Sequence, residues 1–211
     1  MAKRKVYLHI GPAVPGVDEP HAALRGHAAL HAAGLATPKV EQAEMDRADV
    51  EVRRRHKALG LKRKHVEGAW AEVCRRAFKK ARKGYDVVIS QPGFAAADYQ
   101  QVALALDGLV GLQLHLVLTP GASADDDHLA TLVGEWGKFV KKDGRIHVLT
   151  LPPDTTPEQF AAEMARLVVL EEKTEVERRL ENLTRTRRRL KLRLRRIEDE
   201  APDGSGTVDA A

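Results

Sequence analysis

The sequence predicts an α/β fold, a small and mostly parallel sheet flanked by helices, followed by a long C-terminal helix resembling a coiled coil. Over the first 150 residues, short apolar runs alternate with longer amphipathic stretches, which is typical of parallel strands joined by helices. The last part of the chain instead repeats apolar residues in heptads. With 211 residues, 43% of them hydrophobic, the chain can form one core plus an appendage.

Four apolar runs are the strand candidates: residues 6–10, 86–90, 112–118 and 145–151. Each is typical of a buried strand, and all but the last are followed by a Gly or Pro turn and a helical stretch. A helix is expected to begin at Pro20, since proline suits the first helical turn, and to end before Gly34. Gly84 is expected to close the helix that carries Trp70, Val73 and Phe78.

The C-terminal helix is expected to begin around Thr156-Pro157-Glu158 and to continue to about Glu200. Its apolar residues form a seam with heptad spacing, in which Arg187 occupies one place. The seam consists of Val176, Leu180, Leu183, Leu190, Leu194 and Ile197. We therefore divide the chain into an α/β domain (1–165), a charged heptad helix (166–200) and a disordered tail (201–211).

The charges on this helix are separated along its length. Residues 171–181 carry five acids and three bases, whereas residues 184–196 carry eight bases and no acid. Antiparallel pairing would place the acidic half of one copy against the basic half of another. The sequence thus favours an antiparallel dimer or docking of the helix onto its own domain, and a protein partner other than a second copy is also open.

Composition restricts the compartment and the kind of protein. The single cysteine, Cys74, excludes an internal disulfide and fits a reducing compartment, so we expect a cytoplasmic protein. No apolar run is long enough to span a membrane. Aromatic residues make up only 4% of the chain, which argues against a platform for stacking bases.

Several segments together resemble the bacterial sulfotransferase family. They are KVYLHIGPAVPG, the helix ending in ALHAAG, GAWAEVCRRAF, the strand DVVIS, and LQLHLVLTP followed by EWGKFVKK. The resemblance covers about residues 4–165. It implies a P-loop-type α/β fold and 3′-phosphoadenosine-5′-phosphosulfate (PAPS) as the sulfuryl donor.

The loop after the first strand departs from the family pattern. There the family resembles P-K-T-G-T-T, whose lysine and hydroxyls hold the 5′-phosphosulfate. Aligned on Gly16, this chain has Val14 for the lysine and Val17-Asp18 for the hydroxyl pair. We interpret Gly11, Val14, Gly16 and Asp18 as a degenerate phosphate loop. Asp18 and Glu19, just before Pro20, are most simply residues at a helix N-terminus.

Two further departures lie after the other central strands. The family's arginine for the 3′-phosphate aligns near Gly121, and its companion serine aligns with Gly134. The family's Ser-x-Glu, whose acid could act as a base, is matched by Ser90-Gln91-Pro92. We therefore expect no catalytic residue and no cofactor, with PAPS bound only if the enzyme is active.

The leading hypothesis is a sulfotransferase-like protein that has lost PAPS binding and catalysis and acts by protein or polyanion interaction. One alternative is an active PAPS-dependent sulfotransferase. A second alternative is a nonspecific nucleic-acid-binding protein.

The second alternative rests on a basic stretch. Residues 53–83 contain thirteen Lys or Arg against two acids, and we expect them to form a basic helix pair that attracts polyanions. The patch comprises Arg53, Arg54, Arg55, Lys62, Arg63, Lys64, Arg75, Arg76, Lys79 and Lys80. No helix-turn-helix, zinc knuckle or RNA-binding signature accompanies it.

Other candidate residues carry weaker signals. His27 and His31 have the spacing of one helix face, but no third ligand is evident, so no metal site is predicted. We expect His9 and Cys74 to belong to the core. Ser90 has no histidine and aspartate nearby in the sequence, so a nucleophilic triad is not predicted.

Overall fold

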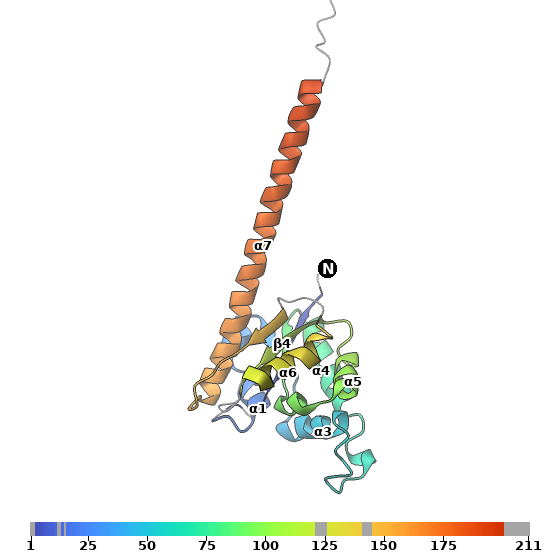
Figure 1. Ribbon diagram of the computed structural model, residues 1–211. Helices are drawn as coiled ribbons and strands as arrows, with labels where there is room; N and C mark the ends of the chain where they lie inside the picture. Colours follow the sequence, from blue (N-terminus) through green and yellow to red (C-terminus); the bar gives the residue numbers. More distant parts are fainter. Residues whose placement is uncertain (1–2, 12–13, 15, 121–125, 141–144, 201–211) are drawn as a thin grey trace, which may run out of the picture. The chain divides into compact units, whose positions relative to one another are not determined.

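Five parallel strands form one sheet in the computed structural model, which describes residues 3–11, 14, 16–120, 126–140 and 145–200 (Figure 1). The strands are β1 (Lys5–Ile10), β2 (Leu35–Ala36), β3 (Asp86–Ser90), β4 (Gln113–Leu118) and β5 (Ile146–Val148). Their order in the sheet is β2-β3-β1-β4-β5. The predicted α/β class is confirmed. The prediction was wrong in missing the two-residue β2 and in making β5 longer than its three residues.

The connecting segments are mostly helical. The helices are α1 (Pro20–Leu24), α2 (Ala28–Ala32), α3 (Gln42–Val52), α4 (Ala69–Arg82), α5 (Tyr99–Asp107), α6 (Asp126–Gly137) and α7 (Pro157–Glu200), with 3-10 turns η1 (Arg63–His65) and η2 (Pro92–Ala96). The predicted long C-terminal helix is confirmed by α7. The single helix expected from Pro20 to Gly34 is instead two short ones, since the chain turns at Gly26, whose φ is +72°.

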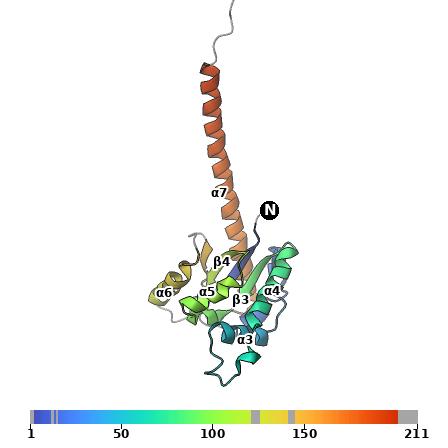
Figure 2. The same cartoon turned by 90° about the vertical axis from the view of Figure 1, so that its right-hand side faces the viewer.

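Side chains of β1 alternate between the two faces of the sheet. Val6, Leu8 and Ile10 belong to the core that α3, α4, α5 and α6 cover. Tyr7 belongs to the opposite core, which α1, α2 and the first turns of α7 cover. Figure 2 shows α4 and α5 in front of the sheet. Both faces are therefore buried, which explains why the parallel strands read as continuous apolar runs.

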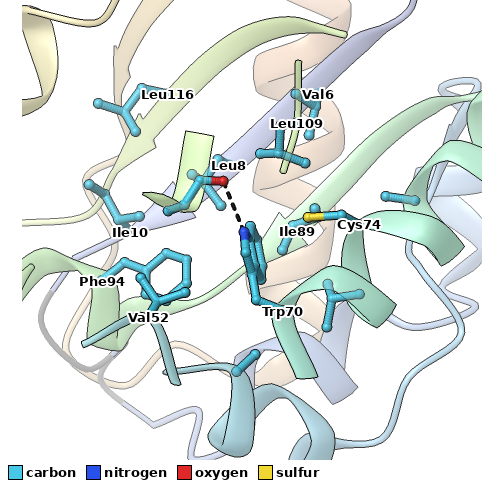
Figure 3. Packing of buried hydrophobic residues seen from close by; sticks show 14 of the residues in the cluster. Val6, Leu8, Ile10, Val52, Trp70, Cys74, Ile89, Phe94, Leu109 and Leu116 are labelled. Carbon is cyan, nitrogen blue, oxygen red and sulfur yellow. Dashed lines mark hydrogen bonds between the residues drawn. The ribbon is translucent and has the colours of Figure 1, made fainter. Parts of the chain in front are cut away.

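Trp70 anchors the larger of the two cores (Figure 3). Its indole Nε1 donates a 2.9 Å hydrogen bond to the carbonyl of Ala105, which ties α4 to α5. Its ring meets Phe94 edge-on, with centroids 5.1 Å apart. Cys74, one helical turn from Trp70, is buried in the same cluster. Burial raises the pKa of its thiol to about 12, so this cysteine is a packing residue.

The connections from the central strands leave the sheet on opposite faces. The chain after β1 passes to the face covered by α1 and α2, whereas the chains after β3 and β4 pass to the other face. In open α/β sheets, ligands bind at the carboxyl ends of the strands where the connections reverse in this way. The loop that begins at Gly11 lies at this edge.

The chain divides into two units after Val168. The first unit contains the sheet and the first turns of α7, whose Phe160, Ala161 and Met164 are buried. The second unit begins at Val169 and contains the rest of α7. The predicted tail, residues 201–211, lies outside the described residues.

Candidate functional site

The candidate phosphate loop starts with a close backbone contact. Gly11 is buried directly after β1, and a Cβ at this position would lie 2.4 Å from Oγ1 and 2.5 Å from the carbonyl oxygen of Thr119. Thr119 follows β4, and its amide donates a 3.2 Å hydrogen bond to the carbonyl of Ile10. Only glycine fits here, and the reason is packing between neighbouring strand ends.

The valines of this loop face the protein interior. Val14, at the place of the family's lysine, is 2% exposed, and Val17 is 3% exposed. Both belong to the core cluster that contains Phe160 and Met164 of α7. The amide of Val17 donates a 3.0 Å hydrogen bond to the carbonyl of Val14, which closes the turn. The loop therefore directs apolar side chains into the core.

Gly16 lies against the segment that precedes α7. Its φ is +75°, and a Cβ there would lie 2.4 Å from the carbonyl oxygen of Thr155. Thr155 is buried and bonds through its own hydroxyl to the carbonyl of Pro152, at 2.6 Å. This partner of the loop was not predicted from the sequence.

The charged residues of the loop are both acidic and exposed. Asp18 and Glu19 precede α1, which begins at Pro20. Glu19 is the N-cap of α1 by position, although its side chain makes no capping hydrogen bond. The two carboxylates therefore give the exposed part of the loop a negative charge.

His9 joins the ends of three strands beneath this loop. Its Nδ1 lies 2.8 Å from Oγ of Ser90, and its Nε2 lies 3.0 Å from Oγ1 of Thr119. The ring also packs against Phe160, with centroids 5.2 Å apart. Burial lowers the pKa of His9 to about 3, so the ring is neutral and one nitrogen donates while the other accepts.

A serine beside a histidine resembles part of a nucleophilic triad, yet this pair is built differently. Ser90 is 1% exposed and His9 is fully buried, so an acceptor molecule cannot reach the hydroxyl. The third partner is the hydroxyl of Thr119, where a triad would use a carboxylate. The two contacts of His9 join β1 to the ends of β3 and β4.

The other sequence-aligned positions have structural roles where they are described. Gln91 is buried and its amide nitrogen donates a 2.6 Å hydrogen bond to the carbonyl of Met45. Pro92, at the place of the family's acid, opens η2. Gly134 lies within α6 with open space beside it. Gly121 lies outside the described residues.

The basic patch differs from the predicted helix pair. α3 ends at Val52 and Arg53 is its C-cap, so residues 54–60 form turns, while Arg63 and Lys64 lie in η1. The prediction was wrong because basic residues alone do not extend a helix; Arg54 has a φ of +55°, which interrupts it.

Acidic neighbours neutralise part of this patch. Arg75 and Arg76 of α4 both bond to Glu72 at 2.6 Å, and Arg76 also pairs with Glu44 of α3 at 3.1 Å. Hydrogen bonds from these two arginines lower the pKa of Glu72 to about 2. Arg53 pairs with Asp49 at 3.4 Å, and Arg63 with Glu67 at 3.0 Å. Within the described ranges, the patch members without an ion pair are Arg54, Arg55, Lys62, Lys64, Lys79 and Lys80.

The seam of α7 is exposed along its length. The relative exposures of its six residues lie between 56% and 67%. They are Val176, Leu180, Leu183, Leu190, Leu194 and Ile197. Isolated exposed leucines are ordinary, but a stripe at heptad spacing is typical of a helix that binds another helix.

Ion pairs are unevenly distributed along α7. In the acidic half, Glu175 pairs with Arg179, and Glu181 pairs with Arg185 at 3.0 Å. In the part of α7 whose side chains are described, the seven basic residues from Arg187 to Arg196 form no ion pair.

His27 and His31 each contact a different partner. His27 is the N-cap of α2 and its Nδ1 accepts from the amide of Ala29 at 3.2 Å, while Nε2 of His31 lies 3.1 Å from the hydroxyl of Tyr85. The shared helix face expected for the two was wrong, since His27 precedes the helix. No cluster of three or more His, Cys, Asp or Glu suited to a metal occurs among the described residues.

Comparison with known proteins adds no family assignment. No protein-family model matches the chain, and no curated protein matches its sequence. In the described ranges, none of the helices combines the length and apolar character that crossing a bilayer requires.

Proposed function

We propose that this chain is a cytoplasmic, sulfotransferase-like protein that lacks the donor site and acts by association through α7. The observation that carries this proposal is the burial of Val14 and Val17. At the places of the family's lysine and of the first residue of its hydroxyl pair, the loop directs its side chains into the core cluster that contains Phe160. Lysine and threonine at these positions would have to face the ligand.

Electrostatics supports the same proposal. The described ionisable side chains of the loop are Asp18 and Glu19, both exposed and both acidic. A unit charge pair about 4 Å apart is worth roughly 1 kcal/mol in water and roughly 4 kcal/mol at an effective dielectric of about 20. Losing one cation and gaining two anions would therefore weaken binding of a phosphosulfate nucleotide by about a thousandfold or more.

The exposed seam of α7 supports association as the mode of action. Its leucines remain in water in the single chain and would be buried between paired helices. The bases from Arg187 to Arg196, which form no ion pair among the described side chains, match the acids of residues 171–181 on a second copy running in the opposite direction. A parallel pair would set the bases against one another. We therefore take a second, antiparallel copy as the partner.

The mass of the chain in solution tests this proposal. Light scattering coupled to gel filtration should give a dimer for the native chain and a monomer for Leu183→Glu with Leu190→Glu. Leu192, which is 60% exposed but off the seam, provides the control: Leu192→Glu should leave the dimer intact. A native monomer over the whole concentration range would contradict self-association.

The enzymatic alternative is tested separately. Incubation of the native chain with labelled PAPS and hydroxyl-bearing acceptors should transfer no sulfuryl group. Transfer that disappears in the Gly16→Ala variant would contradict the proposal that the donor site is absent.

A further inference from the structure

A basic loop with two exposed leucines follows α3. It comprises residues 53–65 and is the teal segment that leaves the end of α3 in Figures 1 and 2. Leu59 is 49% exposed and Leu61 is 40% exposed, on either side of Gly60. Neither the degenerate phosphate loop nor the α7 seam explains why leucines occupy this position.

Backbone hydrogen bonds give the loop a definite conformation. The amide of Leu59 bonds to the carbonyl of Arg55 at 3.1 Å, and that of Leu61 bonds to the carbonyl of His56 at 2.8 Å. Gly60, with a φ of +66°, allows the reversal between the two leucines. These hydrogen bonds form a defined turn in which both leucines are exposed.

Positive charge surrounds the leucines without acidic residues in the loop itself. Residues 53–65 contain seven Lys or Arg and no Asp or Glu. Two of the seven are paired, Arg53 with Asp49 and Arg63 with Glu67. The exposed bases that form no ion pair within the described part of the chain are Arg54, Arg55, Lys57, Lys62 and Lys64.

We infer that this loop binds the surface of an anionic lipid bilayer. Bases attract the negative headgroups, while Leu59 and Leu61 enter the boundary between headgroups and acyl chains. This inference goes beyond association through α7 and does not depend on it. It concerns reversible attachment at the surface, and the loop is far too short to cross a bilayer.

The apolar part of the loop distinguishes a membrane from a nucleic acid. A nucleic acid would gain mainly from the bases, because single-strand binding depends on large aromatic platforms and residues 53–65 contain no Phe, Tyr or Trp. Leucines gain free energy only where they leave water. A bilayer uses both features at once, and one weak signal alone does not hold a protein at its surface.

The size of each contribution can be stated as a change in partitioning. A basic residue close to an anionic surface strengthens binding about fivefold. Reversing Lys62 and Lys64 to glutamate should therefore reduce the partition coefficient by at least about twentyfold. Replacing Leu59 and Leu61 with serine should reduce it by about tenfold.

Sedimentation with lipid vesicles tests the inference. The full chain should sediment with vesicles of phosphatidylcholine and phosphatidylserine and not with vesicles of phosphatidylcholine alone. The variants are Leu59→Ser with Leu61→Ser, and Lys62→Glu with Lys64→Glu. The matched controls are Leu170→Ser, at a leucine 52% exposed on α7, and Arg82→Glu with Lys83→Glu, at two exposed bases at the end of α4.

Both loop variants should lose binding to the mixed vesicles, and both controls should keep it. Light scattering should give the loop variants the same mass as the native chain, which separates this result from a failure of α7 association. Equal binding to both vesicle types would overturn the inference. So would binding to DNA or RNA, lost in the lysine variant and unchanged in the leucine variant, with no sedimentation on vesicles, since that pattern identifies a polyanion site.

Discussion

Nδ1 of His9 lies 2.8 Å from Oγ of Ser90, in a contact that joins β1 to β3 and is closed to solvent on both sides. The second ring nitrogen lies 3.0 Å from Oγ1 of Thr119, so one imidazole on β1 contacts the ends of both β3 and β4. A buried neutral histidine with both nitrogens bonded stabilises the fold only while it remains unprotonated.

This contact predicts a loss of stability in mild acid. Burial lowers the pKa of His9 from 6.5 to about 3 in the folded chain, and that of His21 to about 4. Unfolding therefore takes up protons below pH 6.5, and the free energy of unfolding should fall as the pH falls from 6.5 toward 4. Each histidine contributes a slope of about 1.4 kcal/mol per pH unit. Urea denaturation over this range measures the slope.

Variants assign the slope to the buried ring. His9→Gln should be less stable near neutral pH, because it loses packing against Phe160, but its stability should depend less on pH by about one proton. His65→Gln, at an exposed position of η1, should retain the full dependence. A His9→Gln variant with the native slope would show that His9 is not the group responsible.

Two glycines with similar backbone angles should respond differently to alanine. Gly16 has a φ of +75° and Gly26 a φ of +72°, so a Cβ is strained at both, by about 1 kcal/mol. At Gly16 the new carbon would also lie 2.4 Å from the carbonyl oxygen of Thr155, whereas nothing lies within 4 Å at Gly26. Gly16→Ala should therefore lower the free energy of unfolding by about 2 kcal/mol more than Gly26→Ala. Equal losses would mean that the loop does not press on the segment before α7.

Buried parallel strands were predictable because they are continuous apolar runs. β3 was predicted with its observed ends, and β1 and β4 each differ by one residue. β2 left no such pattern, since Leu35–Ala36 is too short to show a period. The break between α1 and α2 was also missed, because Gly26 can be read as part of a helix until its positive φ is known.

The candidate site was predictable only in part. Gly11 and Gly16 could be singled out from the strand-loop-helix pattern. Their partners could not, since Thr119 after β4 and Thr155 before α7 are distant in the sequence and carry no local signal. The contact between His9 and Ser90 spans 81 positions in the sequence. The exposed turn at Gly60 could not be predicted, because a run of basic residues fits a helix equally well.

Placing a lysine at position 14, as in the sulfotransferase pattern, should not create a donor site. Val14→Lys would place an ammonium in the core cluster that contains Phe160, and the free energy of unfolding should fall by about 2 to 4 kcal/mol. Val148→Lys is the control, because Val148 is 48% exposed and should tolerate the change within about 0.5 kcal/mol. Thermal unfolding measures both. A Val14→Lys chain as stable as the native one that also gains nucleotide binding would contradict the buried orientation of the loop.

Crosslinking should reveal the direction in which two copies of α7 pair. In an antiparallel pair, the end of the seam near Val176 meets the end near Leu194, so an equal mixture of Val176→Cys and Leu194→Cys chains should form a mixed product with a short bifunctional maleimide. Cys74 is buried and does not compete. Each variant alone should crosslink weakly. Efficient crosslinking of Val176→Cys with itself would indicate a parallel pair.

Calorimetric titration with 3′-phosphoadenosine-5′-phosphate tests the central claim most directly, because this nucleotide contains the phosphates that the family's loop holds. With Val14 and Val17 in the core and Asp18 and Glu19 outside, the native chain should give no heat of binding up to about 1 mM ligand. A dissociation constant near about 1 μM would contradict the proposal that this loop does not hold a donor nucleotide.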